Sequence, residues 1–231
     1  MTSLQNSVVL VTGANGGLGS HFVQQALDRG AAKVYASARN PQQWEDPRVV
    51  PLALDVTDRA SIEAAAATAD DVTVLINNAG ISNDANVIGD EEKLRALFET
   101  NFFGPLAVAN AFAPALRNHQ GTLLDVHSVL SWIAIGSGYS ASKAALWSAT
   151  NTLRIQLAEN GVHVVGLHLG YTDTPMTSSV DAPKNDPRDV VASAYDGIEA
   201  NAFEVLADDL SRQVKRGLAE PIEAMYRQLA P

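Results

Sequence analysis

Short apolar runs alternate with longer stretches of helical periodicity along nearly the whole chain, and this alternation limits the possible folds more than any other feature. The runs are rich in Val, Leu, Ile and Ala, as in parallel strands that are buried on both faces of a sheet. They predict seven strands, at Val8–Val11, Lys33–Ala38, Val49–Leu54, Thr73–Ile76, Thr122–Val126, His163–Leu169 and Glu204–Leu206. Strands in alternation with helices indicate repeated βαβ units.

The stretches between the strands predict helices at Leu18–Arg29, Asp58–Ala69, Glu91–Arg117, Tyr139–Asn160, Pro187–Ala200 and Leu210–Leu229. Several have recognisable ends: Asp58 suits an N-cap, Gly30 and Gly161 follow helices, and Pro187 suits a first turn. Right-handed crossovers would arrange these units as an α/β fold, a doubly wound (Rossmann-type) parallel sheet with helices on both faces. Ligands bind beyond the carboxyl ends of the strands in such sheets, so functional residues are expected in the loops that follow strands.

Composition narrows the classes of function. With 46% hydrophobic residues and no linker or repeat, residues 1–231 are predicted to form one domain. A net charge of -10 without a basic patch argues against a nucleic-acid or membrane-surface partner. The chain has no cysteine, and its five histidines lack metal-binding spacing, so we expect no metal site. Neither a signal peptide nor an apolar run of roughly 20 residues is found, which predicts a cytoplasmic protein.

A glycine-rich turn follows the first predicted strand, in the segment Thr12-Gly13-Ala14-Asn15-Gly16-Gly17-Leu18-Gly19, which opens into the first helix. Glycines remove the Cβ atoms that would keep a pyrophosphate away from backbone N–H groups, and a helix N-terminus favours negative charge. A tight strand-to-helix connection without a ligand would show the same letters. Because the turn stands at the start of a βαβ chain, it favours a dinucleotide site. The residues assigned to that site are Gly13, Asn15, Gly17, Leu18 and Gly19.

The end of the second strand indicates which dinucleotide is bound. It reads Ala36-Ser37-Ala38-Arg39 and lacks the carboxylate that usually accepts bonds from the adenosine ribose of NAD. Arg39 can pair with a 2'-phosphate and Ser37 can donate from its hydroxyl, which predicts NADP(H); alternatively Arg39 is a solvated surface residue. Asp55, next to Val56, is assigned to the adenine amino group, with a turn beside Asp58 as the alternative.

Tyr139 and Lys143 lie four residues apart at the start of a predicted helix, where such residues share one face. A nearby ammonium favours the ionised phenol and is expected to lower its pKa, which makes the pair an acid/base. Ser128 follows the Thr122–Val126 strand and can hydrogen-bond a substrate carbonyl oxygen. The alternatives are a half-buried tyrosine beside an exposed lysine, and a loop-capping role for Ser128 with Ser131 as its rival.

The chain resembles the short-chain dehydrogenase/reductase family over essentially its whole length. The parts that carry the resemblance occur in order: Thr12 to Gly19, Asn77-Asn78-Ala79-Gly80, Asn101, Ser128, Tyr139 with Lys143, and Gly170 to Thr174. The resemblance implies reversible hydride transfer between NADP(H) and a small-molecule carbonyl or alcohol. The cofactor would supply the hydride, and the protein would supply orientation and a proton.

The resemblance also implies a role for each matching residue. Tyr139 donates the proton and Ser128 positions the carbonyl oxygen. Lys143 holds the nicotinamide ribose hydroxyls, and Asn101 holds a water that connects Lys143 to solvent. Asn101 is otherwise a polar residue that bends the Glu91–Arg117 helix. The residues expected to support the cofactor elsewhere are Asn78, Ala79, Gly80, Gly170, Thr172 and Thr174, the last at the nicotinamide carboxamide.

Two departures from the family pattern affect the substrate side. The family usually has Pro-Gly where this chain has Leu169-Gly170, so the backbone beside the nicotinamide is expected to be less fixed. The substrate-loop segment from Thr174 to Pro187 is short, which indicates an open site for a compact or variable ketone or aldehyde. The apolar residues assigned to its lining, each of which could instead be core, are Ile81, Trp132, Ile133, Ile135, Tyr171 and Met176.

The sequence leaves open two other classes of function and the oligomeric state. A regulatory protein that senses NADP(H) without turnover would have the same fold, but it would not need Tyr139 and Lys143. A halohydrin-dehalogenase-like lyase typically has arginine at the position of Lys143. The family also forms homodimers or homotetramers by pairing two long helices. Here Phe98, Phe102, Phe103, Trp147 and Leu153 are expected to support that contact or to face their own sheet.

Overall fold

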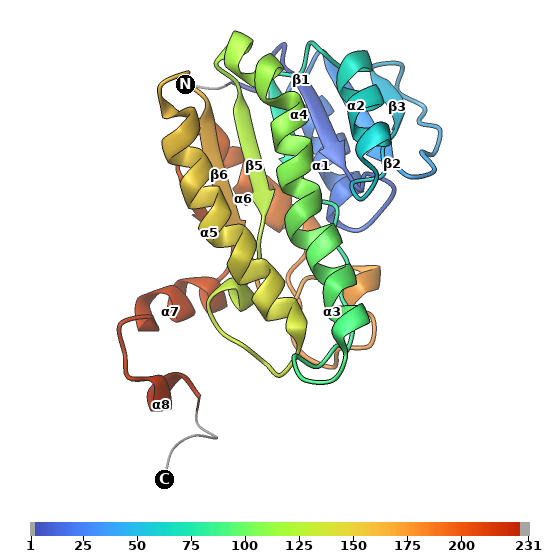
Figure 1. Ribbon diagram of the computed structural model, residues 1–231. Coiled ribbons are helices and arrows are strands. Elements are labelled where there is room, and N and C mark those ends of the chain that lie inside the picture. Colours follow the sequence, from blue (N-terminus) through green and yellow to red (C-terminus); the bar gives the residue numbers. More distant parts are fainter. Residues whose placement is uncertain (1–2, 227–231) are drawn as a thin grey trace.

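The computed structural model describes residues 3–226. Seven strands form one parallel sheet in the order β3-β2-β1-β4-β5-β6-β7 (Figure 1). Their bounds are β1 Val8–Thr12, β2 Lys33–Ala38, β3 Val49–Ala53, β4 Val74–Asn77, β5 Thr122–Val126, β6 His163–His168 and β7 Glu204–Leu206. The order reverses between β1 and β4, so the predicted doubly wound α/β sheet is confirmed.

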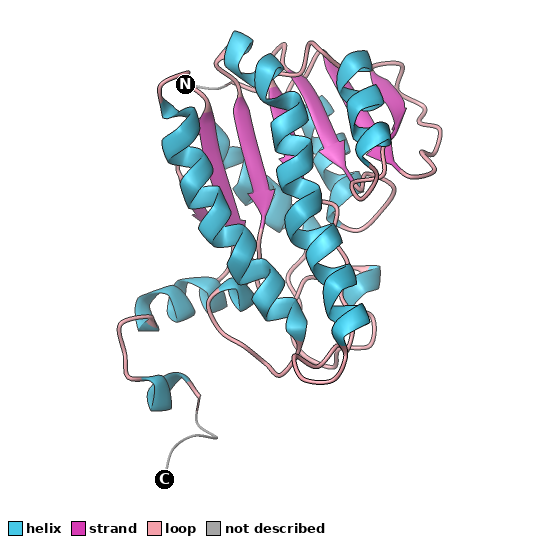
Figure 2. Cartoon of the chain, viewed as in Figure 1, coloured by secondary structure: helices cyan, strands magenta, loops and turns pink. Residues whose placement is uncertain are grey.

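Helices cover both faces of the sheet (Figure 2). They are α1 Leu18–Asp28, α2 Arg59–Thr68, α3 Glu91–Phe98, α4 Gly104–His119, α5 Gly138–Ala158, α6 Pro187–Glu199, α7 Asp209–Gly217 and α8 Ile222–Met225. Asp58 caps α2 by accepting a hydrogen bond from the Ala60 N–H at 2.9 Å. Gly30 and Gly161 have positive φ angles of 85° and 70° after α1 and α5, as their positions in the sequence predict.

Alternate residues of β1 show how the sheet divides the core. Val9 and Val11 pack with Phe22 of α1 and Tyr195 of α6, whose rings meet edge to face at 5.5 Å. Leu10 points to the other face, where α2, α4 and α5 contribute the second cluster, including Phe112. Both faces of the central strands are therefore buried, which is why their sequences read as continuous apolar runs.

The predicted helix Glu91–Arg117 is confirmed as a helical stretch that runs from Glu91 to His119 without a break. Its hydrogen bonding widens at a five-residue π-helical turn, Glu99–Phe103, which lies between α3 and α4. Within it the amide of Asn101 accepts a hydrogen bond from the Ile81 N–H and donates one to the Ile81 carbonyl, both at 2.9 Å. Immediately afterwards Gly104 packs so tightly on Val56 that a Cβ atom would lie 3.0 Å from a Val56 methyl group. These contacts fix the helix on both sides of the wide turn.

The predicted helix Leu210–Leu229 is wrong. The first helix of this segment ends at Gly217, and a second short helix begins only after Pro221. Proline inside a helix removes a hydrogen bond and clashes with the preceding turn, so the helix cannot continue through Pro221. The part beyond Tyr226 lies outside the described residues. Figure 1 shows α7 and α8 extending away from the sheet, below the carboxyl ends of β5 and β6.

Candidate active site

The loops that follow β1, β4, β5 and β6 gather at the carboxyl edge of the sheet, where Figure 2 shows the strand arrows ending. They bring together the glycine turn, Asn78–Gly80, Ser128 and the loop that starts at Gly170. In parallel sheets of this order ligands bind beyond the strand ends near the point of reversal, and the loops that carry the predicted residues follow strands on both sides of that point.

The glycine turn is a tightly built cradle. Gly13 and Gly17 have positive φ angles of 67° and 55°, and a Cβ at Gly19 would lie 2.1 Å from the Gly13 carbonyl oxygen. The Thr12 hydroxyl accepts hydrogen bonds from the N–H groups of Asn78 and Ala79, both at 2.9 Å. The Asn78 amide in turn donates to the Thr12 carbonyl at 2.8 Å. Residues after β4 thus hold the turn in shape.

The loop after β2 is tied to the same turn. The Asn15 amide donates to the Asn40 carbonyl at 2.8 Å and accepts from the Gln42 N–H at 3.2 Å. Leu18 packs on the core, and the exposed Arg39 side chain lies one residue before Asn40. The second-strand end therefore presents a cation beside the glycine turn.

Two residues near Arg39, Ser37 and Asp55, have structural partners of their own. Ser37 is fully buried and its hydroxyl donates to the Val11 carbonyl at 3.0 Å, so it does not present a donor at the surface. Asp55 accepts two bonds from Thr57, at 2.9 Å from the N–H and 2.8 Å from the hydroxyl. These bonds, together with the charge of Arg39, lower the pKa of Asp55. Asp55 thus builds the turn before α2 through Oδ1, and its assignment to the adenine amino group stays a prediction.

Ser128 and Tyr139 are neighbours after β5. Ser128 lies two residues beyond the end of β5 in extended geometry, and its Oγ accepts from the Leu130 N–H at 3.1 Å. The Ser128 hydroxyl is also close enough to the Tyr139 phenol to lower the pKa of that group. The Ser131 hydroxyl instead receives the Ser128 N–H, at 3.4 Å. Ser128 is therefore both a loop cap and the partner of the tyrosine, and Ser131 is no rival.

Lys143 lies under the tyrosine. It is 5% exposed, its Nζ donates to the Val126 carbonyl at 2.8 Å, and the same atom is 5.8 Å from the centroid of the Tyr139 ring. Burial lowers the pKa of Lys143 to about 8, although the carboxylate of Asp125 acts in the opposite direction. Tyr and Lys thus share one face at the start of α5, as their spacing predicts.

The expected lowering of the tyrosine pKa is wrong for this structure. Burial raises the pKa of Tyr139 to about 12, and the hydrogen bond with Ser128 offsets only part of that rise. The ammonium of Lys143 faces the Val126 carbonyl rather than the phenol oxygen. Tyr139 is consequently a protonated phenol at neutral pH, a state suited to donating a proton.

Asn101 lies beside this group. A Cβ placed on Gly80 would be 3.2 Å from the Asn101 Oδ1 and 3.8 Å from the Lys143 Nζ, so both polar groups border the same glycine. The Asn101 amide also donates to the Ser142 hydroxyl at 3.2 Å. Because Gly80 has no side chain, the Asn101 amide and the Lys143 ammonium can both approach the same backbone position.

The loop after β6 closes the site from the other side. The Thr172 carbonyl accepts bonds from the hydroxyls of Thr174, at 3.3 Å, and of Thr177, at 2.5 Å. The Thr174 side chain lies 3.7 Å from the position of a Cβ on Gly17, so the loop reaches the glycine turn. Gly170 at the start of the loop donates its N–H to Asp208.

Of the apolar residues predicted to line the site, Trp132 has a different role. Its ring stacks on His168 at 3.9 Å, and the Nζ of Lys215 lies 5.0 Å above it. His168 in turn places Nδ1 3.3 Å from the Ser128 carbonyl oxygen. Ile81 and Ile133 are partly buried, whereas Ile135, Tyr171 and Met176 are exposed at 55%, 37% and 48%. Sequence reasoning missed His168 and Asp208, although both stand at or after the ends of predicted strands.

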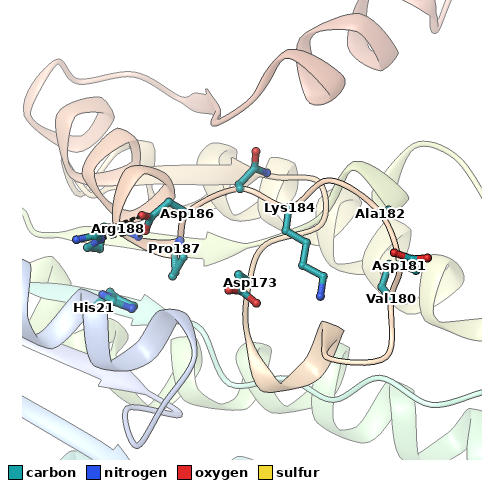
Figure 3. A pocket seen from close by; sticks show the side chains of 10 residues that line it. His21, Asp173, Val180, Asp181, Ala182, Lys184, Asp186, Pro187 and Arg188 are labelled. Atoms are coloured by element: carbon teal, nitrogen blue, oxygen red, sulfur yellow. Dashed lines mark hydrogen bonds and ion pairs between the residues drawn. The ribbon is translucent and has the colours of Figure 1, made fainter.

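An open cleft of about 660 Å³ lies between α1 and the segment that runs into α6. Figure 3 shows its charged lining, with His21 on α1 facing Arg188 and Asp186, and Lys184 near Asp173. The Arg188 guanidinium is paired with Asp186 at 2.6 Å. Most of the residues that line this cleft belong to the substrate-loop segment 174–187.

Within residues 3–226, no helix is both long enough and apolar enough to cross a membrane. Nowhere in that range do three His, Cys, Asp or Glu side chains gather as they would around a metal ion.

The family model and two solved structures that match this chain are of short chain dehydrogenases or reductases. A family model for short chain dehydrogenases matches residues 7–185. A crystal structure of a short chain dehydrogenase from Burkholderia cenocepacia J2315 in complex with NADP is 36% identical, with a TM-score of 0.93 and 100% of both chains covered. The NADPH bound carbonyl reductase from chicken fatty liver is 30% identical, with a TM-score of 0.76 over 84% of this chain and 87% of that one.

A sequence relative has a more specific description. The NADPH-dependent 1-acyldihydroxyacetone phosphate reductase of Schizosaccharomyces pombe is 35% identical over 182 residues, which are 74% of this chain and 61% of that protein.

Proposed function

The chain belongs to the short-chain dehydrogenase family of oxidoreductases, and we propose that it reduces a ketone or aldehyde to an alcohol with NADPH, reversibly, with Tyr139 as general acid and base. The observation that carries the proposal is the meeting of Ser128 and Tyr139 above the buried Lys143, at the crevice bordered by the glycine turn. We propose further that residues 1–231 act as one domain, with 174–187 as the substrate loop.

The glycine cradle fits a dinucleotide. Cβ atoms at Gly13 or Gly19 would collide with neighbouring backbone, so this turn can only be built with glycine and brings N–H groups to its surface. Gly13, Asn15, Gly17, Leu18 and Gly19 would hold the pyrophosphate side, with Asn78, Ala79 and Gly80 bracing them. When bound, the cofactor supplies the hydride.

Arg39 supports NADPH rather than NADH. It is exposed beside the turn that Asn15 ties to the loop after β2, and no carboxylate ends that strand. A guanidinium can bind the doubly charged 2'-phosphate by donating paired hydrogen bonds to it. Three relatives described above are named for NADP or NADPH, which agrees with this choice.

The proton chemistry follows from the two hydroxyl groups. Ser128 would donate a hydrogen bond to the substrate oxygen and stabilise the negative charge that develops there. Tyr139, protonated at neutral pH, would then deliver its proton to that oxygen. The ammonium of Lys143 would stabilise the phenolate left behind and hold ribose hydroxyls. Asn101, next to Lys143 at Gly80, would connect the lysine to solvent through a bound water.

Exposed aromatic and aliphatic side chains support assembly into a homodimer or homotetramer. Phe103, between α3 and α4, is 51% exposed, and Ile155 on α5 is 77% exposed. Phe98, Phe102 and Trp147 nearby are partly exposed. Light scattering of the purified protein tests this part of the proposal, and a monomer at working concentrations would contradict it.

The decisive experiment is a screen of purified protein against ketones, aldehydes and secondary alcohols, with nicotinamide absorbance followed for NADPH and NADH. We expect turnover with NADPH. Tyr139→Phe should keep NADPH binding and reduce kcat by at least about a hundredfold, the usual size of a general acid contribution. Tyr35→Phe is the matched control, because its hydroxyl bonds Asp71 under α2, away from the crevice.

Two outcomes would contradict the proposal. Comparable turnover by Tyr139→Phe and Tyr35→Phe would reject the assignment of the acid. Tight NADPH binding without turnover of any compound in the panel would instead indicate a protein that senses the cofactor.

A further inference from the structure

One carboxylate joins the two ends of the loop after β6 to the start of α7. Oδ2 of Asp208 accepts hydrogen bonds from the Gly170 N–H at 2.6 Å and from the Asn185 side-chain amide at 2.7 Å. Its other oxygen, Oδ1, accepts the Ser211 N–H at 2.7 Å and so caps the helix. Three segments distant in sequence are therefore held by a single side chain.

The two ends of this loop are also paired through their backbones. The Asn185 N–H donates to the Tyr171 carbonyl at 2.8 Å, and the Asp173 N–H donates to the Asn185 carbonyl at 3.0 Å. Thr172 and Asn185 consequently form an isolated parallel bridge. The backbone pairing closes the loop on itself, and the carboxylate of Asp208 attaches the closed loop to the body of the protein.

The Asp208 carboxylate is ionised under ordinary conditions. Burial by itself raises its pKa, but the bonds from Gly170, Ser211 and Asn185 outweigh that effect and hold the pKa below its usual value. Hydrogen bonds to an ionised acceptor are about twice as strong as neutral ones. The contact is also close, since a Cβ on Gly170 would lie 3.3 Å from Oδ2 of Asp208.

This contact bears on the departure at Leu169-Gly170. A proline at position 169 would fix the backbone beside the nicotinamide through its ring. Leucine has no such restraint, so another group has to hold the Gly170 backbone. In this structure that group is Asp208.

We propose that Asp208 is a positioning residue, which fixes Gly170 and Asn185 and thereby the Gly170–Thr174 backbone against which the nicotinamide is oriented. This inference rests on the proposed function for its effect on catalysis, but the attachment itself does not. Asp208 lies immediately before α7, which packs near Trp132, and it reaches the site through its bonds to Gly170 and Asn185.

The test uses a variant that keeps the helix cap. Asp208→Ser retains a good N-cap hydroxyl for Ser211 but is too short to reach Gly170 and Asn185. Asp209→Ser is the matched control, because that carboxylate is fully exposed and pairs only with Arg212. Asp208→Asn is expected to be intermediate, since an amide has one acceptor oxygen and can satisfy either the loop or the cap.

Hydrogen–deuterium exchange of the whole protein tests the attachment without any turnover. In Asp208→Ser, peptides covering Gly170–Thr174 and Asn185 should exchange roughly tenfold faster than in the wild type, as expected when a charge-assisted bond is lost. Exchange in β1 and α5 should not change. Equal exchange at Gly170 in Asp208→Ser and Asp209→Ser would overturn the proposal.

Steady-state kinetics test whether the attachment by Asp208 matters for catalysis. Asp208→Ser should lower kcat roughly ten- to a hundredfold, the loss that follows a misplaced reacting group. The deuterium isotope effect with 4-deuterated NADPH should rise, because hydride transfer becomes slower than product release. A loss of folded protein would lower kcat without changing the isotope effect. An unchanged isotope effect with faster exchange would overturn the positioning role, whereas a wild type without turnover would refute only the proposed function.

Discussion

Gly19 allows the most quantitative prediction, because its surroundings define how far a side chain would displace the turn. A methyl group at this position would lie 2.1 Å from the Gly13 carbonyl oxygen and 2.9 Å from the Ala14 Cα. Ordinary contacts begin at 3.4 Å, so the two atoms would have to move apart by about 1.3 Å. Both neighbours are backbone atoms of the turn, and neither can move without moving the cradle.

The size of the effect follows from this displacement. Overpacking of this kind costs about 1–3 kcal/mol. Alanine gains up to about 1 kcal/mol over glycine in a helix, which offsets part of the loss. Subtracting that gain leaves a net loss of up to about 2 kcal/mol, which corresponds to a Tm lower by up to roughly 4–8 °C in a domain of this size. A turn displaced by more than 1 Å should also weaken NADPH binding by at least about tenfold.

Gly16 provides the control within the same turn. Nothing lies within 4 Å of a Cβ at Gly16, and its φ is not positive, so Gly16→Ala should keep both its Tm and its NADPH affinity. Thermal unfolding and fluorescence titration with NADPH measure the two quantities for both variants. If Gly19→Ala binds NADPH as tightly as Gly16→Ala, the argument that the cradle requires close approach is refuted.

Three further predictions concern charge and the hydroxyl pair. Arg39→Ala should raise the Kd for NADPH far more than the Kd for NADH in equilibrium titrations; equal losses would remove its phosphate role. Ser128→Ala should lower kcat by roughly a hundredfold while Ser131→Ala, which loses only a capping bond, stays within severalfold, and steady-state kinetics that rank them otherwise would reject the assignment. The pKa of Lys143 is about 8 when folded and 10.5 ordinarily, so the unfolded chain binds more protons between these values and stability should rise with pH from 8 to 10; urea unfolding of Lys143→Met should show no such rise.

The strands and most helix ends could be predicted from the sequence because local signals decide them. Apolar runs buried on both faces give strands whose ends differ by at most one residue from the prediction. Asp58 caps the start of α2 with its side-chain oxygen, and Gly30 follows α1 with a positive φ angle that glycine adopts easily. Pro221 was also a local signal, and the predicted helix through it overlooked the clash that proline creates.

Features that depend on distant contacts could not be predicted in the same way. The π-helical turn is fixed by the bonds between Asn101 and Ile81, twenty residues apart, while helical periodicity alone suggests one continuous helix. Ser37 is a polar residue near the end of a strand, which suggests a hydroxyl donor at the surface. Its position in β2 opposite Thr12 places it inside the sheet. Asp208 looks like an ordinary N-cap, and only the fold brings Gly170 and Asn185 to its second oxygen.

For the candidate site, the order of motifs along the chain was a reliable guide to position and a poor guide to charge. Ser128, Tyr139 and Lys143 meet as expected, because strand ends and a helix start converge at one edge of the sheet. The protonation preference of Tyr139 was wrong, because burial depends on packing that the spacing of two residues does not reveal.

The π-helical turn at Glu99–Phe103 makes this stretch unusually sensitive to length. A π-helical turn holds one residue more than an α-helical turn. Deleting one residue here would leave an unbroken α-helix, and α3 and α4 would keep nearly the same phase because the wide turn already absorbs the extra residue. The widened backbone at Asn101 would be lost, and with it the direction of the Asn101 side chain. Losing one residue from a loop is often harmless, but losing one residue here would remove the hydrogen bonds between Asn101 and Ile81.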